Sequence, residues 1–243
     1  MERHIVPLHD SEGRKLWYDS TEDMKAMAGH ISSLNFDAVF KAANQRHRIS
    51  LVNKAFFQEA HYSALLDEVE FDHGRRMPMQ YKNSLSCINY AVSNFDRDLD
   101  EDIVIKLYSL LSRNSLSRSI TGMHNVESII EFIDFYNYYE CSPLTKSCII
   151  CYYFEKIHPI HDSSGRMGRM LTLMYLLRNG YEFVKYYSLS HMIFQNREEI
   201  GTAFECSGGT TGITEPIETM LRSYSEGIDA LAKINYTGKK TVS

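Results

Sequence analysis

The sequence predicts an all-α fold. The spacing of apolar residues indicates helices, and the composition and length indicate one packed domain. Apolar residues recur at three- and four-residue spacing through most of the 243 residues, and few stretches alternate with the period of two that marks a strand. The composition, 44% hydrophobic with 5 Pro and 13 Gly, supplies a packed core and excludes a disordered chain. The length favours one large domain, or one domain with an appendage.

Amphipathic segments follow one another along the chain, separated by helix stop and start signals. Ser142-Pro143 places Pro at the first position of a helix, and Asn179-Gly180 closes another. Residues 115–125 are too rich in Ser, Thr, Gly and Asn for a helix and predict a short hairpin or loop. Helices are expected over residues 33–45, 50–70, 80–95, 101–113, 126–139, 143–157, 165–179, 189–205 and 215–233.

We expect an N-terminal helical appendage over residues 1–45 and the main domain over residues 46–243. The net charge of −5 argues against binding nucleic acid by bulk electrostatics. No window approaches the ~18 apolar residues of a membrane span, and the N-terminus does not resemble a signal sequence, so the expected location is the cytoplasm. The 5 Cys are expected to be reduced, with Cys148 and Cys151 packed in the core.

The candidate chemistry is concentrated in residues 158–169, where a loop enters a predicted helix. The start of a helix presents unpaired backbone N–H groups and a partial positive charge, both of which suit phosphate. Arg166 and Arg169, three positions apart, project from one face as two phosphate-binding forks. The small residues that let the backbone donors approach a ligand are Ser163, Ser164 and Gly165.

The same stretch supplies a metal ligand and a base. Asp162 is a hard oxygen ligand that can hold Mg²⁺. His158 and His161 both have a pKa suited to taking a proton from a hydroxyl, and the residue types do not choose between them. Together these groups indicate a nucleotide-phosphate transfer site. The other interpretation is that His158 and Asp162 cap helix ends and that the arginines pair with surface acids.

This stretch resembles the Fic motif of the Fic/Doc family, H-P-F-x-[DE]-G-N-G-R-x-x-R. It departs from the motif at Ile160, Ser163 and Ser164, where the family has Phe, Gly and Asn. The resemblance extends over roughly residues 50–225 and implies a Fic-like helical bundle, with a short flap at residues 115–125. The matching positions are His158, Pro159, Asp162, Gly165, Arg166 and Arg169.

The resemblance implies a protein adenylyltransferase, which uses Mg²⁺ to transfer AMP from ATP to a hydroxyl of a target protein. His158 would be the base and Asp162 would hold the Mg²⁺. The backbone of residues 163–166 would form the anion hole, Arg166 would contact the phosphates, and Arg169 would orient the γ-phosphate. The partners it implies are ATP and an unidentified target protein. Self-modification and a homodimer are left open, and no nucleic-acid or membrane partner is expected.

Residues 58–68 resemble the N-terminal inhibitory helix of many Fic proteins, whose signature is [ST]-x-x-x-E-[GN]. Ser63 occupies its Ser/Thr position and Asp67 its acidic position, and the carboxylate would pair with Arg169 and deny it to the γ-phosphate. Aspartate is one methylene, roughly 1.5 Å, shorter than glutamate, so Glu68 is a second candidate. The other interpretation is that these acids form a solvated helix face.

Two other functions stay open. Ser163 and Ser164 weaken the motif, which favours a catalytically degenerate Fic domain that binds a nucleotide or a protein. His161-Asp162 is also the dipeptide of metal-dependent HD phosphohydrolases, which would need further ligands from other helices. The candidates for those ligands are His30, His47, His61, His73 and His191.

Overall fold

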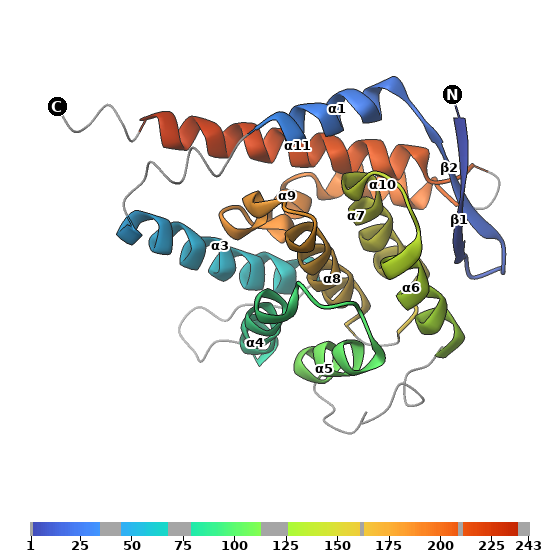
Figure 1. The fold of residues 1–243 in the computed structure, drawn as a ribbon, viewed down its shortest axis with the longest axis horizontal. Helices are drawn as coiled ribbons and strands as arrows, with labels where there is room; N and C mark the ends of the chain where they lie inside the picture. Colours follow the sequence, from blue (N-terminus) through green and yellow to red (C-terminus); the bar gives the residue numbers. More distant parts are fainter. Residues whose placement is uncertain are drawn as a thin grey trace.

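The structure is a computed structural model that describes residues 2–34, 45–67, 79–112, 126–160, 163–208 and 211–237. Helices make up most of it, and the only sheet in the described part has two strands, so the predicted all-α class is confirmed. Figure 1 shows the helices gathered around a central pair, with the small sheet at one end.

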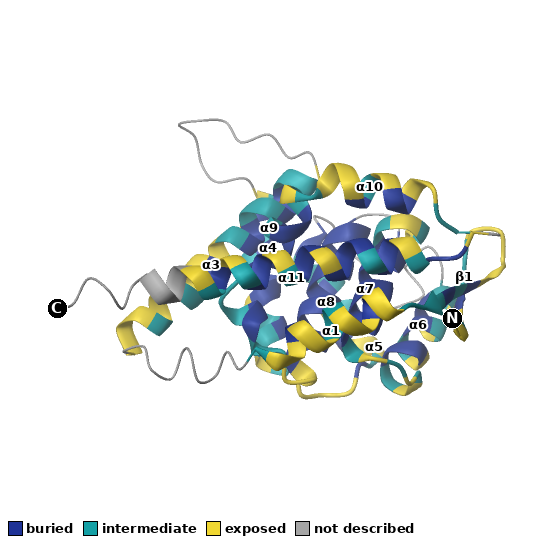
Figure 2. Ribbon diagram, turned by 90° about the horizontal axis from the view of Figure 1, so that it is seen from above, coloured by how far each residue is buried: buried dark blue, intermediate teal, exposed yellow. Residues whose placement is uncertain are grey.

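The central pair is α7 (Pro143–Tyr152) and α8 (Ser164–Arg178). Every residue of α7 after Pro143 is buried, and so is every residue of α8 before Arg178. A helix that is buried all round needs neighbours on all its sides. Figure 2 shows these buried residues at the centre of the molecule, with the exposed residues on the surrounding helices.

The neighbours of the central pair come from both halves of the chain. Helices α3, α4, α5 and α9 contact α8, and α11 contacts α7. Among the capping residues, Asp100 accepts a hydrogen bond from the backbone N of Ile103 (2.8 Å) at the start of α5. The surrounding helices are α3 (Gln45–Leu66), α4 (Met79–Asn94), α5 (Glu101–Leu111), α6 (Val126–Tyr138), α9 (Leu189–Gln195), α10 (Arg197–Glu205) and α11 (Thr214–Thr237).

The prediction of a single helix over residues 189–205 is wrong, because the structure has two helices there. α9 ends and α10 begins at Asn196, whose backbone leaves the helical region (φ −108°, ψ 20°). The Asn196 side chain donates to the carbonyl of Met192 (3.3 Å), a local side-chain bond that competes with continuing the helix.

The N-terminal segment corrects the prediction of an entirely helical appendage. β1 (Glu2–His9) and β2 (Lys15–Ser20) form an antiparallel hairpin. The alternation of buried and exposed side chains is short. In β1 only Val6 and Leu8 are fully buried, and Ile5 and Pro7 beside them are exposed. A periodicity of so few residues is hard to separate from a helical pattern in the sequence.

The turn of this hairpin is held by Asp10. Its carboxylate accepts hydrogen bonds from the backbone N of Glu12 and of Arg14, both 2.9 Å, and Gly13 has the positive φ (+76°) that the reversal needs. This polar turn was the available sequence signal for a hairpin, and the prediction of a helical appendage overlooked it.

Helix α1 (Glu22–Ser33) follows the hairpin and packs against α11. The helix expected at residues 33–45 falls mainly on residues 35–44, which lie outside the described residues. The strand before α1 is also joined to the main bundle, because the backbone N of Ile213 donates to the carbonyl of Trp17 (2.8 Å). The boundary at residue 45 stays a prediction.

The buried cysteines behave as core residues. All five cysteines are free, and Cys148 and Cys151 are buried on α7. Burial raises the pKa of both thiols above the ordinary value, so neither is activated as a thiolate.

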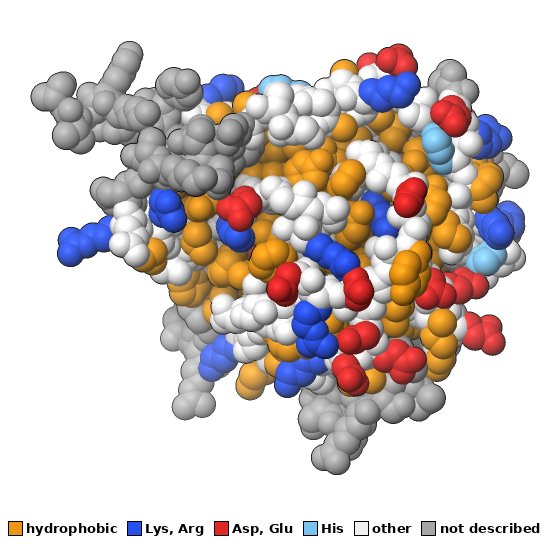
Figure 3. All heavy atoms as spheres, in the orientation of Figure 1, with side chains coloured by type: hydrophobic (Ala, Val, Ile, Leu, Met, Phe, Trp, Pro, Cys, Tyr) orange, Lys and Arg blue, Asp and Glu red, His pale blue; other side chains and the backbone are white. Residues whose placement is uncertain are grey.

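The surface carries charges of both signs. On the face that Figure 3 shows, acidic and basic side chains are interspersed around apolar patches. Within the described ranges, no helix is both long and apolar enough to cross a membrane.

Candidate functional site

The candidate site is built at the junction of α7 and α8. α7 continues into a π-helical turn (Tyr153–Ile157), which ends at His158 in the left-handed conformation (φ 50°, ψ 60°). The His158 side chain is exposed, while Ile160 is 1% exposed and packs into the core. Ile160 therefore packs as an apolar side chain at the position where the family has an aromatic residue. His161 and Asp162 lie outside the described residues.

The first turn of α8 presents two serines. Ser163, the residue before α8, has φ 62° and ψ 22°, so a left-handed backbone carries a side chain where the family has glycine. That conformation costs a residue with a Cβ about 1 kcal/mol or more. The Ser164 hydroxyl is buried and donates to the carbonyl of Phe154 (2.7 Å), so it is turned toward the π-helical turn.

Two glycines allow α8 to lie close to the π-helical turn. A Cβ at Gly165 would stand 2.5 Å from the Glu155 carboxylate, and one at Gly168 would stand 2.5 Å from the Cβ of Phe154. Atoms cannot approach that closely, so this packing needs glycine at position 168, whereas a Cβ at position 165 would require the Glu155 carboxylate to move. The close approach places the carboxylate of Glu155 beside the N-terminal turn of α8.

Arg169 is a fully buried guanidinium with carboxylates on two sides. It forms ion pairs with Glu155 through Nη1 and with Asp67 through Nη2 (2.8 Å). Its Nε donates to the Ser63 hydroxyl (3.1 Å), and Nη2 also donates to the Ser63 carbonyl (3.0 Å). Burial alone lowers the pKa of Arg169, but the carboxylates of Glu155 and Asp67 outweigh burial and raise the pKa above its ordinary value.

Arg166 meets the same carboxylate. Its Nε donates to Oδ2 of Asp67 (2.7 Å), while Oδ1 of Asp67 accepts from Arg169. The other side of Arg166 is held by the body of the protein, because Nη1 donates to the carbonyl of Leu111 (3.3 Å) and Nη2 to the hydroxyl of Ser163 (2.6 Å). One carboxylate thus bridges two buried arginines, as a phosphate would.

The structure brings together most of the residues that the sequence singled out. Ser63 on α3 and Asp67 directly after it meet Arg166 and Arg169 on α8, and the pairing of Asp67 with Arg169 is present (Figure 1 shows the end of α3 beside α8). Asp67 reaches both arginines despite its shorter side chain. Glu68, the second candidate for that role, lies outside the described residues.

Sequence reasoning missed Glu155 as a member of the site. It stands in the run Phe154–Ile157 that leads into the motif, and a carboxylate three residues before the candidate base was the available signal. The contact with Arg169 depends on the π-helical turn and on the space left by Gly165, and neither can be read from residue types.

Among the described residues, no group of three or more His, Cys, Asp or Glu could hold a metal ion, while His161 and Asp162 of the HD dipeptide and His73 lie outside them. Of the histidines considered, His30 pairs with Asp229 (2.9 Å) and His191 stacks on Tyr62 (ring centroids 4.2 Å apart). Neither of these two histidines contacts the arginines.

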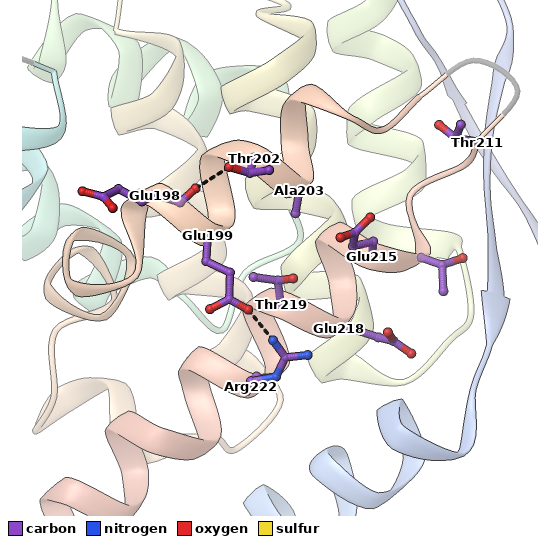
Figure 4. A pocket seen from close by; sticks show the side chains of 10 residues that line it. Glu198, Glu199, Thr202, Ala203, Thr211, Glu215, Glu218, Thr219 and Arg222 are labelled. Carbon is purple, nitrogen blue, oxygen red and sulfur yellow. Dashed lines mark hydrogen bonds and ion pairs between the residues drawn. The ribbon is translucent and has the colours of Figure 1, made fainter.

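A separate open groove of about 800 Å³ lies along α10 and α11 (Figure 4), and neither Arg166 nor Arg169 lines it. Two residues that line this groove, Glu199 and Arg222, form an ion pair. None of the residues predicted for the site lines it.

Comparison with known proteins points to the Fic/DOC family. Residues 94–176 match the model of the Fic/DOC family, and this range includes the motif and both arginines. A crystal structure of a Fic family protein from Desulfovibrio desulfuricans G20 has a similar fold, with a TM-score of 0.69 and 16% identity over 90% of this chain and 77% of that chain.

A fragment of Fic-1 from C. elegans has a TM-score of 0.59 and 11% identity, over 87% of this chain and 71% of that chain. A variant of that fragment, with one glutamate replaced by glycine, gives the same TM-score at 12% identity. At these identities the likeness shows the fold alone, and no curated protein matches the sequence significantly. The recognition of the Fic/Doc family from the sequence is confirmed.

Proposed function

We propose that this Fic-type protein transfers AMP from ATP to a hydroxyl side chain of a target protein, and that helix α3 holds the activity in check. The observation that carries the proposal is the convergence of Arg166 and Arg169 on a single carboxylate beside the first turn of α8. Two buried cations that share one anion form a preorganised phosphate site, and phosphoryl transfer depends mainly on positioning and charge neutralisation.

The residues of this chain fit a nucleotide polyphosphate. The donors that Asp67 occupies, Nε of Arg166 and Nη2 of Arg169, would bind phosphate oxygens once the carboxylate leaves. The backbone of residues 163–166 would hold the phosphate under attack. Asp162 would hold Mg²⁺, which when bound neutralises phosphate charge.

His158 would be the base. Its side chain is exposed at the end of the π-helical turn, where a target hydroxyl can reach it. The imidazole would take the hydroxyl proton while the hydroxyl oxygen bonds to the α-phosphorus of ATP. The bond from that phosphorus to the bridging oxygen would break, and pyrophosphate would leave with its electron pair.

Asp67 would inhibit by holding the arginines. Because its two oxygens engage both guanidinium groups, the triphosphate must displace a carboxylate that already satisfies them. Replacing Asp67 with glycine removes this competitor, and we expect it to raise nucleotide transfer.

A second candidate function is a Fic domain that binds a nucleotide or a protein without catalysis. The observation that favours it is the pair of serines, since Ser163 is strained and the Ser164 hydroxyl bonds to Phe154 instead of facing a ligand. A Ser163→Gly/Ser164→Asn variant, which reverses two of the three departures from the family motif, would gain transfer activity under this alternative, whereas the unaltered chain would have none.

The test is the intact mass of the protein after incubation with ATP and Mg²⁺, alone and with a cell lysate. We expect a gain of one AMP mass, on the protein itself or on a lysate target, that is larger for Asp67→Gly and absent for His158→Ala. An adduct that persists in His158→Ala would contradict the role of His158. No adduct in any variant, with ATP binding still detectable by thermal shift, would favour the binding-module alternative.

A further inference from the structure

Helix α3 carries a stripe of polar residues at four-residue spacing. Glu59 and Ser63 lie one turn apart on the same face, with Asp67 four residues further on, directly after the last residue of α3, and the buried Glu59 and Ser63 are 3% and 0% exposed. The apolar residues that α3 buries completely are only alanines, Ala55, Ala60 and Ala64. Leu51, Phe56 and Leu66 also pack against the core but are only partly buried, so Glu59 and Ser63 make up a large share of what α3 buries completely.

Glu59 is attached to a part of the protein that takes no part in the candidate site. Its Oε2 accepts from the hydroxyl of Ser188 (2.7 Å) and from the backbone N of Ser190 (3.0 Å), and its Oε1 accepts from the hydroxyl of Ser190 (2.5 Å). All three donors are neutral. A buried carboxylate is tolerated only when such donors satisfy it, and hydrogen bonds to a charged acceptor are roughly twice as strong as neutral ones.

The hydroxyl of Ser188 is held in place for its contact with Glu59. Ser188 also accepts from the backbone N of His191 (3.0 Å), so the hydroxyl that donates to Glu59 is itself fixed at the start of α9. Two turns of helix, about 12 Å, separate Glu59 from Asp67. A rigid helix held at one of these points keeps the other in register.

We infer that Glu59 is a positioning residue: it fastens α3 to Ser188 and Ser190 and thereby holds Asp67 on the two arginines. The role of Glu59 in holding α3 is independent of the proposed function. Only the identity of the anion that the freed arginines bind rests on that function. Loss of the Glu59 contacts lets α3 leave α8 more often, and each departure exposes Arg166 and Arg169 to an anion.

The test is hydrogen exchange measured by mass spectrometry on the full chain, for Glu59→Gln, Ser190→Ala and the unaltered protein. Gln keeps the shape of Glu59 but loses its charge and one acceptor, so we expect amides of α3 to exchange about 10- to 100-fold faster. Amides of α11, which does not depend on α3 for its own core, should keep their rate. Ser190→Ala removes one donor and should give a smaller increase in α3.

The second measurement is the binding of inorganic tripolyphosphate by calorimetry. Glu59→Gln should bind it more tightly than the unaltered protein, and should add little in an Asp67→Ala background, where the competing carboxylate is already gone. Glu205→Gln, an exposed glutamate on α10, is the matched control and should change neither measurement.

The outcomes are decisive in both directions. Unchanged exchange in α3, or an equal increase in α3 and α11, would overturn the inference, because the first means no fastening and the second means general destabilisation. If Glu59→Gln does not fold, Ser190→Ala decides by the same criterion. Faster exchange of α3 without any AMP adduct would leave the fastening established and reject the proposed function alone.

Discussion

Helices α3 and α8 meet at the same two arginines, but they are attached to the molecule in different ways. α8 is buried on all sides, with large apolar side chains such as Leu171 and Leu176 fully enclosed. α3 buries alanines and a polar stripe, and it leaves Ile49 and Phe57 about half exposed (53% and 51%). Apolar burial holds α8, whereas hydrogen bonds and ion pairs hold much of α3.

This difference in attachment indicates which of the two helices can move. Burying a large apolar side chain stabilises a protein by about 1.5–3 kcal/mol, and α8 has many such residues. Ion pairs and hydrogen bonds contribute less in net terms, because water competes for the same groups. The arginines therefore stay with the core, and the carboxylate that occupies them sits on the helix that can leave.

The largest expected effect is in the core. Leu171→Ala should lower the free energy of unfolding by about 2–5 kcal/mol, because it opens a cavity in a fully buried position. Leu51→Ala on α3, where the side chain is half-buried, should cost about 1 kcal/mol. Urea unfolding of both variants measures the contrast, and equal losses would contradict it.

The contact between α8 and the π-helical turn comes next. Gly168→Ala should cost about 1–3 kcal/mol, since the added Cβ would collide with Phe154. Gly201→Ala on α10 is the matched control, because nothing lies within 4 Å of its Cβ position. There alanine should stabilise the helix by about 0.5–1 kcal/mol, as read from thermal unfolding.

A smaller effect is expected where α3 meets the arginines. Asp67→Asn should lower stability by about 1–2 kcal/mol, because it removes the charge that bridges two buried cations while keeping one acceptor. Chemical denaturation would measure it. Asp229→Asn, which breaks the exposed pair with His30, should stay within about 0.5 kcal/mol, and a comparable loss there would remove the distinction.

The smallest effect isolates the strain at Ser163. Ser163→Gly and Ser163→Ala both lose the hydroxyl that accepts from Arg166, but only alanine keeps a Cβ in the left-handed conformation. We expect the glycine variant to be more stable than the alanine variant by about 0.5–1 kcal/mol. Glycine relieves the backbone strain, but it also raises the entropy of the unfolded chain, which offsets part of that gain. Alanine as stable as glycine would mean that the site is not strained.

Much of the fold and part of the site could be predicted from local patterns. The spacing of apolar residues places α7 and α8, and Pro143 marks the start of α7. The N-terminal hairpin was missed because its alternation involves so few residues and its turn chemistry at Asp10 was overlooked. The break at Asn196 was missed because one side-chain hydrogen bond leaves little trace in a periodic pattern.

Residue types at short spacing are enough to predict the class of fold and the motif that begins α8. The contact of Glu155 with Arg169, the bridge of Asp67 between two arginines and the contact of Glu59 with α9 follow only from how the helices pack. These contacts join residues 14, 99 and 131 positions apart. Side-chain partners at such separations are set by how the helices pack, and packing depends on the whole chain.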